Sequence, residues 1–331
     1  MNRPILAETK ALTKHYYSRH SWLKQLKSRA SAVQAVNHID LHIGRGETLG
    51  LIGESGCGKS TLGRTLLRLH EPTSGQVFFD EQEITHLSFN QMKNLRKRMQ
   101  IIFQDPYASL NPRMSVEEII SLPLKIHESL PQSELQARVR EIAARVGLNT
   151  AQLQRYPHQF SGGQRQRIGI ARALVTNPDF IVCDEPVSAL DVSIQAQVIR
   201  LLEDLRKEFS LTYLLISHDI SVVGYLSDRI AVMYLGEIVE QGPTKSLLSN
   251  PKHPYTQALL EAIPRVDHLE RPPRIVLKGD LPSPLNPPSG CKFHTRCPHV
   301  IEQCSQIAPE QLTEKNGHFV KCFLFSEQKN E

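Results

Sequence analysis

Residues 53–60 read Gly53-Glu54-Ser55-Gly56-Cys57-Gly58-Lys59-Ser60. This run matches the pattern G-x-x-x-x-G-K-[ST], a glycine-rich loop whose backbone N–H groups surround phosphate groups. An apolar segment with the character of a strand precedes it, and the leucines that follow it recur at helical spacing. That order matters because the N-terminus of a helix carries a partial positive charge that favours phosphate. The sequence therefore predicts a nucleotide-binding site at this loop.

The side chains and the backbone of the loop have separate predicted roles. Lys59 is expected to reach the β- and γ-phosphates, Ser60 to ligate Mg²⁺, and Thr61 to add a hydroxyl to the α-phosphate. The backbone expected to surround the phosphates belongs to Gly53, Glu54, Ser55, Gly56, Cys57 and Gly58. We interpret the side chains of Cys57 and Cys183 as packing groups.

A second chemical signal is an apolar strand, residues 180–183, that ends in the carboxylates Asp184 and Glu185. Ligand sites of parallel sheets lie at the carboxyl ends of the strands, so we expect Asp184 to lie beside the phosphate loop and to hold Mg²⁺, largely through water. Glu185 is the predicted catalytic base, which accepts a proton from the attacking water. By itself such a pair more often indicates solvated charge at a strand end, but the phosphate loop favours catalysis.

The remaining pattern is that of an α/β protein. Strands and helices alternate in the second half of the chain, which predicts a mostly parallel sheet. The predicted strands are 180–183, 212–216 and 229–233, and the predicted helices are 193–209 and 221–226. Earlier in the chain we predict a strand at 33–43 joined through a hairpin turn to a strand at 47–52, a further strand at 99–103, and a helical subdomain inserted at 112–175.

Composition limits the class of protein. The 331-residue chain has 40% hydrophobic and 22% charged residues. This composition is typical of a folded α/β protein and excludes a disordered or fibrous one. Its apolar stretches are strand-sized, whereas a membrane span needs about 20 residues, and residues 1–14 lack the layout of a secretory signal. We therefore expect the chain to remain in the cytosol. The net charge of +5 suits a nucleotide or a membrane surface, and equally an ordinary basic enzyme.

Residues 160–167 read Phe160-Ser161-Gly162-Gly163-Gln164-Arg165-Gln166-Arg167. This run resembles the signature motif of ABC transporter ATPases. Ser161 and the amides of Gly162 and Gly163, at the start of a helix, would form a second anion site for a γ-phosphate presented by another chain. The resemblance implies a P-loop NTPase fold of the ABC type, with a mostly parallel sheet, an antiparallel β subdomain and an inserted helical subdomain. Gln164 joins the predicted nucleotide contacts as part of this motif.

The same family resemblance gives roles to four further positions. Gln104, directly after a strand, resembles the glutamine that contacts Mg²⁺ and the attacking water. His218 resembles the histidine that contacts the γ-phosphate, so the implied catalytic set is Glu185, His218, Gln104 and Lys59. Ser188-Ala189-Leu190-Asp191 resembles the loop that makes contacts across the dimer. Tyr16 resembles the aromatic residue that stacks on adenine, and Tyr17 competes for that role.

Longer segments resemble one branch of the family. Phe103-Gln104-Asp105-Pro106-Tyr107-Ala108-Ser109-Leu110-Asn111-Pro112 and Asn250-Pro251-Lys252-His253-Pro254-Tyr255-Thr256 are similar to the ATPases of peptide and nickel importers. With the insertion between Tyr17 and Val33 and the segment 281–291, the chain resembles the second ATPase subunit of a dipeptide or oligopeptide importer. The implied function is ATP hydrolysis that powers import of di- or oligopeptides; nickel and cationic antimicrobial peptides stay open as alternative cargo, because other subunits select the cargo.

The resemblance also implies the partners and the location of the chain. They are a sister ATPase subunit in a heterodimer, two transmembrane permease subunits and an extracytoplasmic peptide-binding protein, with the chain peripheral on the cytoplasmic face of the cytoplasmic (inner) membrane. We expect no nucleic acid partner. An ABC ATPase of DNA repair or translation is a rival, but such proteins usually carry a long coiled coil or two ATPase domains in one chain. An inactive regulatory subunit would have replaced Glu185 or His218, and both are present.

Past Asn250 the chain becomes rich in proline and then in cysteine, so we expect an ABC nucleotide-binding domain at 1–250 and a C-terminal extension at 251–331. The cysteines are Cys291, Cys297, Cys304 and Cys322. In a reducing cytosol such crowding indicates a metal rather than disulfides, although the spacing differs from the short C-x₂₋₄-C pairs of zinc sites. The resemblance implies a structural [4Fe–4S] cluster on these thiolates; zinc or four unligated thiols remain alternatives.

Overall fold

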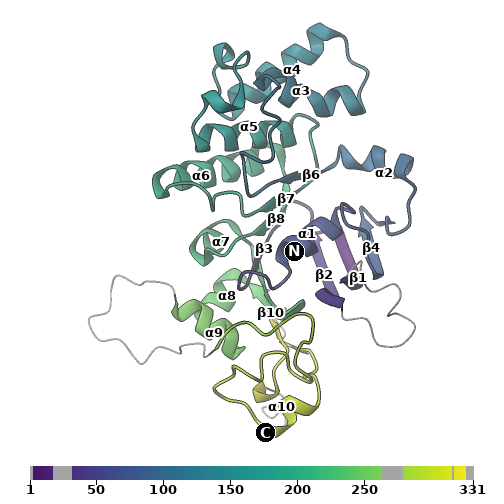
Figure 1. Cartoon of the computed structure of the whole chain (residues 1–331), viewed down its shortest axis with the longest axis vertical. Helices are drawn as coiled ribbons and strands as arrows, with labels where there is room; N and C mark the ends of the chain where they lie inside the picture. Colours follow the sequence, from purple (N-terminus) through teal and green to yellow (C-terminus); the bar gives the residue numbers. More distant parts are fainter. Residues whose placement is uncertain (1–2, 18–31, 263–278, 315–316, 326–331) are drawn as a thin grey trace. The chain divides into compact units, whose positions relative to one another are not determined.

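A computed structural model describes residues 3–17, 32–262, 279–314 and 317–325 (Figure 1). Most of the insertion after Tyr17, residues 18–31, and the proline-rich residues 263–278 lie outside the described residues. The described chain forms two compact units. The first unit consists of the described residues within Met1–Ala7, His42–Thr48 and Phe78–Ser217, and the second of the described residues within Glu8–Leu41, Leu49–Val77 and His218–Glu331.

The first unit contains three parallel strands, β6 (Met99–Ile102), β7 (Phe180–Asp184) and β8 (Thr212–Ile216). Phe180 pairs with Met99 on one side and with Thr212 on the other. Every residue of β7 and β8 is buried, as expected of apolar strands in a parallel sheet that is covered on both faces. Helix α6 (Val192–Phe209) connects β7 to β8, which confirms the predicted alternation of strands and helices.

Helices dominate the rest of the first unit. α3 (Val116–His127), α4 (Gln132–Arg145) and α5 (Gly162–Leu174) pack against one another (Figure 1), and α2 (Phe89–Arg96) precedes β6. Short 3₁₀ turns, η2 (Thr150–Gln152) and η3 (Pro157–Gln159), separate α4 from α5. The sequence sets the start of α3, since Ser115 accepts the N–H of Glu118 and Glu118 accepts the N–H of Ser115. The helices predicted between residues 112 and 175 are therefore present.

The second unit contains strand β3 (Thr48–Ile52) from Leu49 onward, parallel to β9 (Arg229–Tyr234), with β10 (Glu237–Pro243) antiparallel to β9. The C-terminal residues extend this arrangement, because β12 (Phe319–Val320) pairs with β10 and β11 (Leu312–Thr313) pairs with β12. The shorter elements of the unit are α1 (Lys59–Leu66), α7 (Ile220–Leu226), α8 (Thr244–Ser249), α9 (Pro254–Glu261), α10 (Glu302–Gln306) and η4 (Phe323–Phe325).

The predicted hairpin between residues 33–43 and 47–52 is wrong. β2 (Ala32–Gly44) belongs to a four-stranded sheet with β1 (Ile5–Tyr17), β4 (Ser74–Phe79) and β5 (Gln82–Glu83), in the order β2-β1-β4-β5, whereas β3 belongs to another sheet. The burial patterns explain the difference. β2 alternates buried and exposed residues through its second half, as a half-exposed strand does, while all five residues of β3 are buried.

Over the described parts of the chain, no helix combines the length and the apolar character needed to cross a membrane.

Candidate functional site

The phosphate loop lies in the second unit, between β3 and α1. Gly58 immediately precedes the helix with a φ of 110°, a left-handed conformation that favours glycine. A Cβ at this position would lie 1.9 Å from the carbonyl oxygen of Ala35. The second glycine of the G-x-x-x-x-G-K-[ST] pattern is thus required both by its backbone conformation and by the close approach of another strand.

Lys59 is buried at the first position of α1, and its ammonium is held by the loop itself. Its Nζ donates to the carbonyl of Gly53 at 2.7 Å and to the carbonyl of Glu54 at 3.0 Å. Ser60 and Thr61 follow in the first turn and are partly buried. Cys57 is buried, and burial raises the pKa of its thiol, in keeping with the predicted packing role.

Tyr16, near the end of β1, makes one contact through its hydroxyl and one through the face of its ring. The hydroxyl lies 2.7 Å from Nδ1 of His70, and the ammonium of Lys14 lies 4.9 Å from the ring centroid. Tyr16 is 37% exposed and Tyr17 is 52% exposed, so both rings have surface available for stacking. His218, also in the second unit, is exposed between β8 and α7.

The first unit brings Gln104 and Glu185 together. Nε2 of Gln104 donates to Oε2 of Glu185 at 2.8 Å. Glu185 directly follows β7 with a φ of 50°, a conformation that is uncommon for a residue with a side chain and that often marks a functional site. Its N–H donates to the carbonyl of Ile216 at 2.9 Å, which fixes the backbone at the end of the parallel strands. Asp184, one residue earlier, is 1% exposed.

The loop after Glu185 is also fixed by hydrogen bonds within the first unit. Oγ of Ser188 donates to the carbonyl of Glu185 at 3.1 Å. Asp191 starts α6, since its Oδ1 accepts the N–H of Ile194 at 3.0 Å, and hydrogen bonds from Ser193 and from Ile194 lower the pKa of its carboxyl. The segment 188–191 therefore joins the end of β7 to a capped helix.

The signature segment begins a helix, as the sequence predicts. α5 starts at Gly162, Oγ of Ser161 accepts the N–H of Gln164 at 3.4 Å, and Oε1 of Gln164 accepts the N–H of Ser161 at 3.1 Å. Gly163 is needed for packing, because a Cβ there would lie 2.3 Å from Cγ2 of Ile194 in α6. The exposed Ser161 thus stands at the positive end of a helix.

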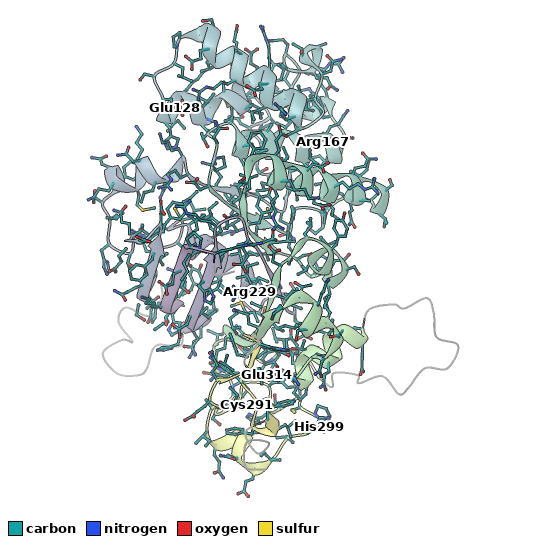
Figure 2. The ribbon with its side chains drawn as sticks, turned by 180° about the vertical axis from the view of Figure 1, so that it is seen from behind. Glu128, Arg167, Arg229, Cys291, His299 and Glu314 are labelled. Carbon is teal, nitrogen blue, oxygen red and sulfur yellow. The ribbon has the colours of Figure 1, made fainter. Side chains whose placement is uncertain are left out.

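The four C-terminal cysteines line one pocket in the second unit, together with His253, His294 and His299. Cys291 and His299 are labelled in this yellow region in Figure 2. All four are free thiols. Burial, with the other sulfurs adding to it, raises the pKa of Cys291 to about 12 and that of Cys322 to about 11. Within residues 3–17, 32–262, 279–314 and 317–325, however, no three potential ligand side chains are arranged to hold one metal ion.

Comparison with known proteins decides the family. Residues 36–188 match the model described as "ABC transporter", and residues 239–304 match "Oligopeptide/dipeptide transporter, C-terminal region". The oligopeptide transport ATP-binding protein AppF of Bacillus subtilis is 54% identical over 316 residues, which cover 95% of each chain. The chain belongs to the oligopeptide/dipeptide branch of the ABC transporter ATP-binding subunits.

Further relatives agree with this assignment. The dipeptide transport ATP-binding protein DppF of Escherichia coli is 46% identical over 330 residues, covering 100% of this chain and 97% of that protein. A solved dimeric structure of the ATP-binding cassette MJ0796, in a post-hydrolysis state bound to ADP and Pi, is 29% identical with a TM-score of 0.64. It covers 72% of this chain and 99% of its own. This ABC transporter subunit is therefore an ATPase, and its family implies an ATPase dimer and membrane permease partners.

Sequence reasoning missed two arginines of α5 that hold the segment following Gln104. The guanidinium carbon of Arg165 lies 3.7 Å from the ring centroid of Tyr107, a cation–π contact. Nη1 of Arg172 donates to the carbonyl of Ser109 at 2.5 Å, and burial lowers the pKa of that guanidinium. The available signal was the spacing of seven residues, which puts both arginines on one face of the signature helix.

Proposed function

We propose that this ABC transporter ATPase hydrolyses ATP to power import of di- or oligopeptides across the cytoplasmic membrane. The observation that carries the proposal is the identity of 46–54% with peptide transport ATP-binding proteins over nearly the whole chain. The match of residues 239–304 to the C-terminal region of oligopeptide and dipeptide transporters supports it further, because that region lies outside the part shared by ABC transporters in general.

The second unit supplies the groups that bind the nucleotide in this proposal. Lys59 leaves its loop carbonyls and pairs with the β- and γ-phosphates, while the N–H groups of residues 53–58 and of Ser60 and Thr61 donate to phosphate oxygens. Tyr16 stacks on adenine, and His218 donates to the γ-phosphate. The left-handed backbone of Gly58 supports this arrangement, and so does the start of α1, where the N-cap residue Gly58 has no side chain to occupy the helix N–H groups.

The first unit supplies the group that activates water. Glu185 accepts a proton from water, whose oxygen attacks the γ-phosphorus as the bond to the bridging oxygen of ADP breaks. Gln104, hydrogen-bonded to that carboxylate, orients the water. Ser60, Gln104 and Asp184 would hold Mg²⁺, since hydroxyl, amide and carboxylate oxygens are the ligands it prefers. When bound, Mg²⁺ neutralises charge on the phosphates.

The signature segment acts in trans in this proposal. Ser161, Gly162, Gly163 and Gln164 donate to the γ-phosphate of ATP held by the partner ATPase, and the partner's signature segment closes the ATP site of this chain. The exposed start of α5 at Ser161 supports such a role, since a helix N-terminus attracts anions and this one faces solvent in this chain. Hydrolysis then separates the two subunits, and the permeases follow that movement.

The proposed assembly contains a sister ATPase in a heterodimer, two permease subunits and an extracytoplasmic peptide-binding protein. The chain lies on the cytoplasmic face of the membrane, with a nucleotide-binding domain at 1–250 and an extension at 251–331. In this assembly the binding protein and the permeases select the peptide, and this subunit turns over ATP.

We propose that Cys291, Cys297, Cys304 and Cys322 hold a [4Fe–4S] cluster, with zinc as the alternative. Their common pocket supports the proposal, which requires the four thiols to move closer together, because no three side chains of the described residues surround one ion. The raised thiol pKa values mean that a bound cation must offset the thiolate charge. Iron, sulfide and zinc analysis of chain purified without oxygen tests this. Stoichiometric iron and sulfide support the cluster; zinc alone, or no metal, contradicts it.

The experiment that tests the function is uptake of labelled dipeptides, longer peptides and nickel. Cells lacking the chain are compared with cells that carry it or its Glu185→Gln variant. We expect peptide uptake to be lost in the deletion strain and in the variant strain, and restored by the native chain. Loss of nickel uptake alone would reassign the cargo, and unchanged uptake of every cargo would refute the proposal.

A further inference from the structure

The C-terminal extension reaches the phosphate loop at Glu54. Nη1 of Arg296 lies 2.6 Å from Oε2 of Glu54, and Nη2 lies 3.0 Å from Oε1, so the two side chains form a bidentate ion pair across 242 positions of sequence. The N–H of the same glutamate donates to the hydroxyl of Tyr255 at 2.8 Å. The carbonyl of Glu54 accepts from Lys59. One residue of the loop therefore connects the extension to the phosphate-binding lysine.

The side chain of Arg296 is largely buried, and its contacts fix its position in the extension. It lies one residue before Cys297, its side chain is only 6% exposed, and Nη1 is 3.5 Å from the hydroxyl of Tyr234. Glu54 and Tyr234 raise the pKa of the guanidinium above its ordinary value, so the group is charged at every working pH. Charge-assisted bidentate pairs of this kind combine strength with fixed geometry.

Phe293, three residues before Arg296, anchors the same segment. It is 1% exposed, and its ring centroid lies 5.3 Å from that of Tyr234 and 5.4 Å from that of Tyr255. The three aromatic rings form one packed group, with Tyr234 and Tyr255 at 4.7 Å from each other. The positions of Arg296 and of the Tyr255 hydroxyl are therefore set by the same packing.

Glu240 fixes the turn that carries Tyr255. This carboxylate is fully buried, and it accepts the N–H of Lys252 at 2.7 Å and the N–H of His253 at 2.9 Å. It also lies 2.7 Å from Nε2 of His318, in the C-terminal residues. His253 then caps α9, where Tyr255 is the second residue. The histidine–proline–tyrosine segment, residues 253–255, thus places the hydroxyl of Tyr255 where it accepts the N–H of Glu54 in the phosphate loop.

We infer that Arg296 and Tyr255 are positioning residues for ATP binding, which hold Glu54 so that its carboxylate is neutralised and its carbonyl keeps Lys59 within the loop until ATP binds. An anionic carboxylate in a loop that surrounds phosphates opposes their binding unless a cation offsets its charge. Arg296 supplies that cation, and the fixed loop loses less conformational freedom when ATP binds. The inference rests on the proposed role of Lys59 and of its loop.

The test measures the dissociation constant of a fluorescent ATP analogue with the purified full-length chain. Arg296→Gln should weaken binding about tenfold, the size of a typical coupling between paired charges. The dissociation constant of Arg296→Lys should lie between those of the native chain and Arg296→Gln, because lysine keeps the charge and loses the bidentate geometry. Tyr255→Phe should weaken binding about threefold, as expected for one lost hydrogen bond. Lys292→Gln, which removes a charge from the same segment, is the matched control and should bind like the native chain.

The variant Glu54→Gln tests whether Arg296 acts on ATP binding through Glu54 or only stabilises the extension. If Arg296 neutralises Glu54, the double variant Glu54→Gln/Arg296→Gln should recover most of the lost affinity, because no unpaired carboxylate remains. If Arg296 only stabilises the extension, the two substitutions act independently and the double variant stays weak, which overturns the inference.

Lys59→Ala distinguishes the inference from the function on which it rests. Native affinity in Lys59→Ala would refute the proposed loop itself. Lost affinity in Lys59→Ala, together with native affinity in Arg296→Gln and in Tyr255→Phe, would overturn only the inference about the extension.

Discussion

Gly163 shows how closely the signature segment is packed. A Cβ at Gly163 would lie 2.3 Å from Cγ2 of Ile194, whereas a Cβ at the neighbouring Gly162 would lie 3.3 Å from Cδ2 of Leu190. We predict that Gly163→Ala lowers the free energy of unfolding by about 1–3 kcal/mol, the usual cost of overpacking. Gly162→Ala is the matched control, in which the helix propensity of alanine offsets the tighter contact. Urea denaturation measures both, and equal stabilities would contradict the packing argument.

Tyr16 and Tyr17 offer a second test at the scale of single residues. We predict that Tyr16→Ala weakens ATP binding about three- to tenfold, because an aromatic stacking contact is worth about 0.5–1.5 kcal/mol. The contacts of Tyr16 with His70 and Lys14 hold its ring in one place, which favours it over its neighbour. Tyr17→Ala is the control and should bind ATP normally. The opposite result in a binding titration would transfer the stacking role to Tyr17.

At the scale of elements, an ion-pair network joins the strands and loops of the first unit. Asp80 follows β4 and pairs with Arg45 and with Nη2 of Arg98 at 2.7 Å, while Nε of Arg98 lies 2.5 Å from Asp179, directly before β7. Hydrogen bonds from Arg98 and then from Arg45 lower the pKa of the Asp80 carboxyl. The folded form therefore favours the ionised carboxylate.

This shift predicts a definite dependence on pH. Because the pKa of Asp80 is lower in the folded chain, its contribution is fully present above the ordinary value of 3.8 and is lost as the pH falls through the folded pKa. Asp80→Asn should cost about 1 kcal/mol at neutral pH, a modest value since the pair is partly exposed, and less in acid. The exposed Asp204→Asn is the control. A cost that grew on acidification would contradict this account.

β7, α6 and β8 follow directly from apolar runs and helical spacing, and they were predictable within a residue or two. The hairpin between β2 and β3 was not, because a turn between two strands does not show whether they pair or enter different sheets. The contact of Arg165 with Tyr107 could not be predicted from the sequence either, since a helical arginine is usually solvated.

At the scale of the whole molecule, short sequence motifs were enough to predict the protein family, whereas contacts between residues far apart in the sequence could not be predicted. The order of phosphate loop, signature segment and acidic strand end was sufficient to predict an ABC ATPase, which the relatives confirm. The gathering of four cysteines in one pocket followed from their crowding, although their metal remains a prediction. The pairing of Arg296 with Glu54 could not be predicted, because single charges carry no sign of a partner 242 positions away.

The most direct test of the account is the Glu185→Gln variant in the complete transporter, measured for ATP binding and for phosphate release. We predict native ATP binding and hydrolysis reduced by about a hundredfold or more, the usual effect of losing a general base. Glu203→Gln, which removes a carboxylate from α6, is the control and should turn over normally. Hydrolysis by Glu185→Gln at the native rate would contradict the assignment of Glu185 as the base that activates water.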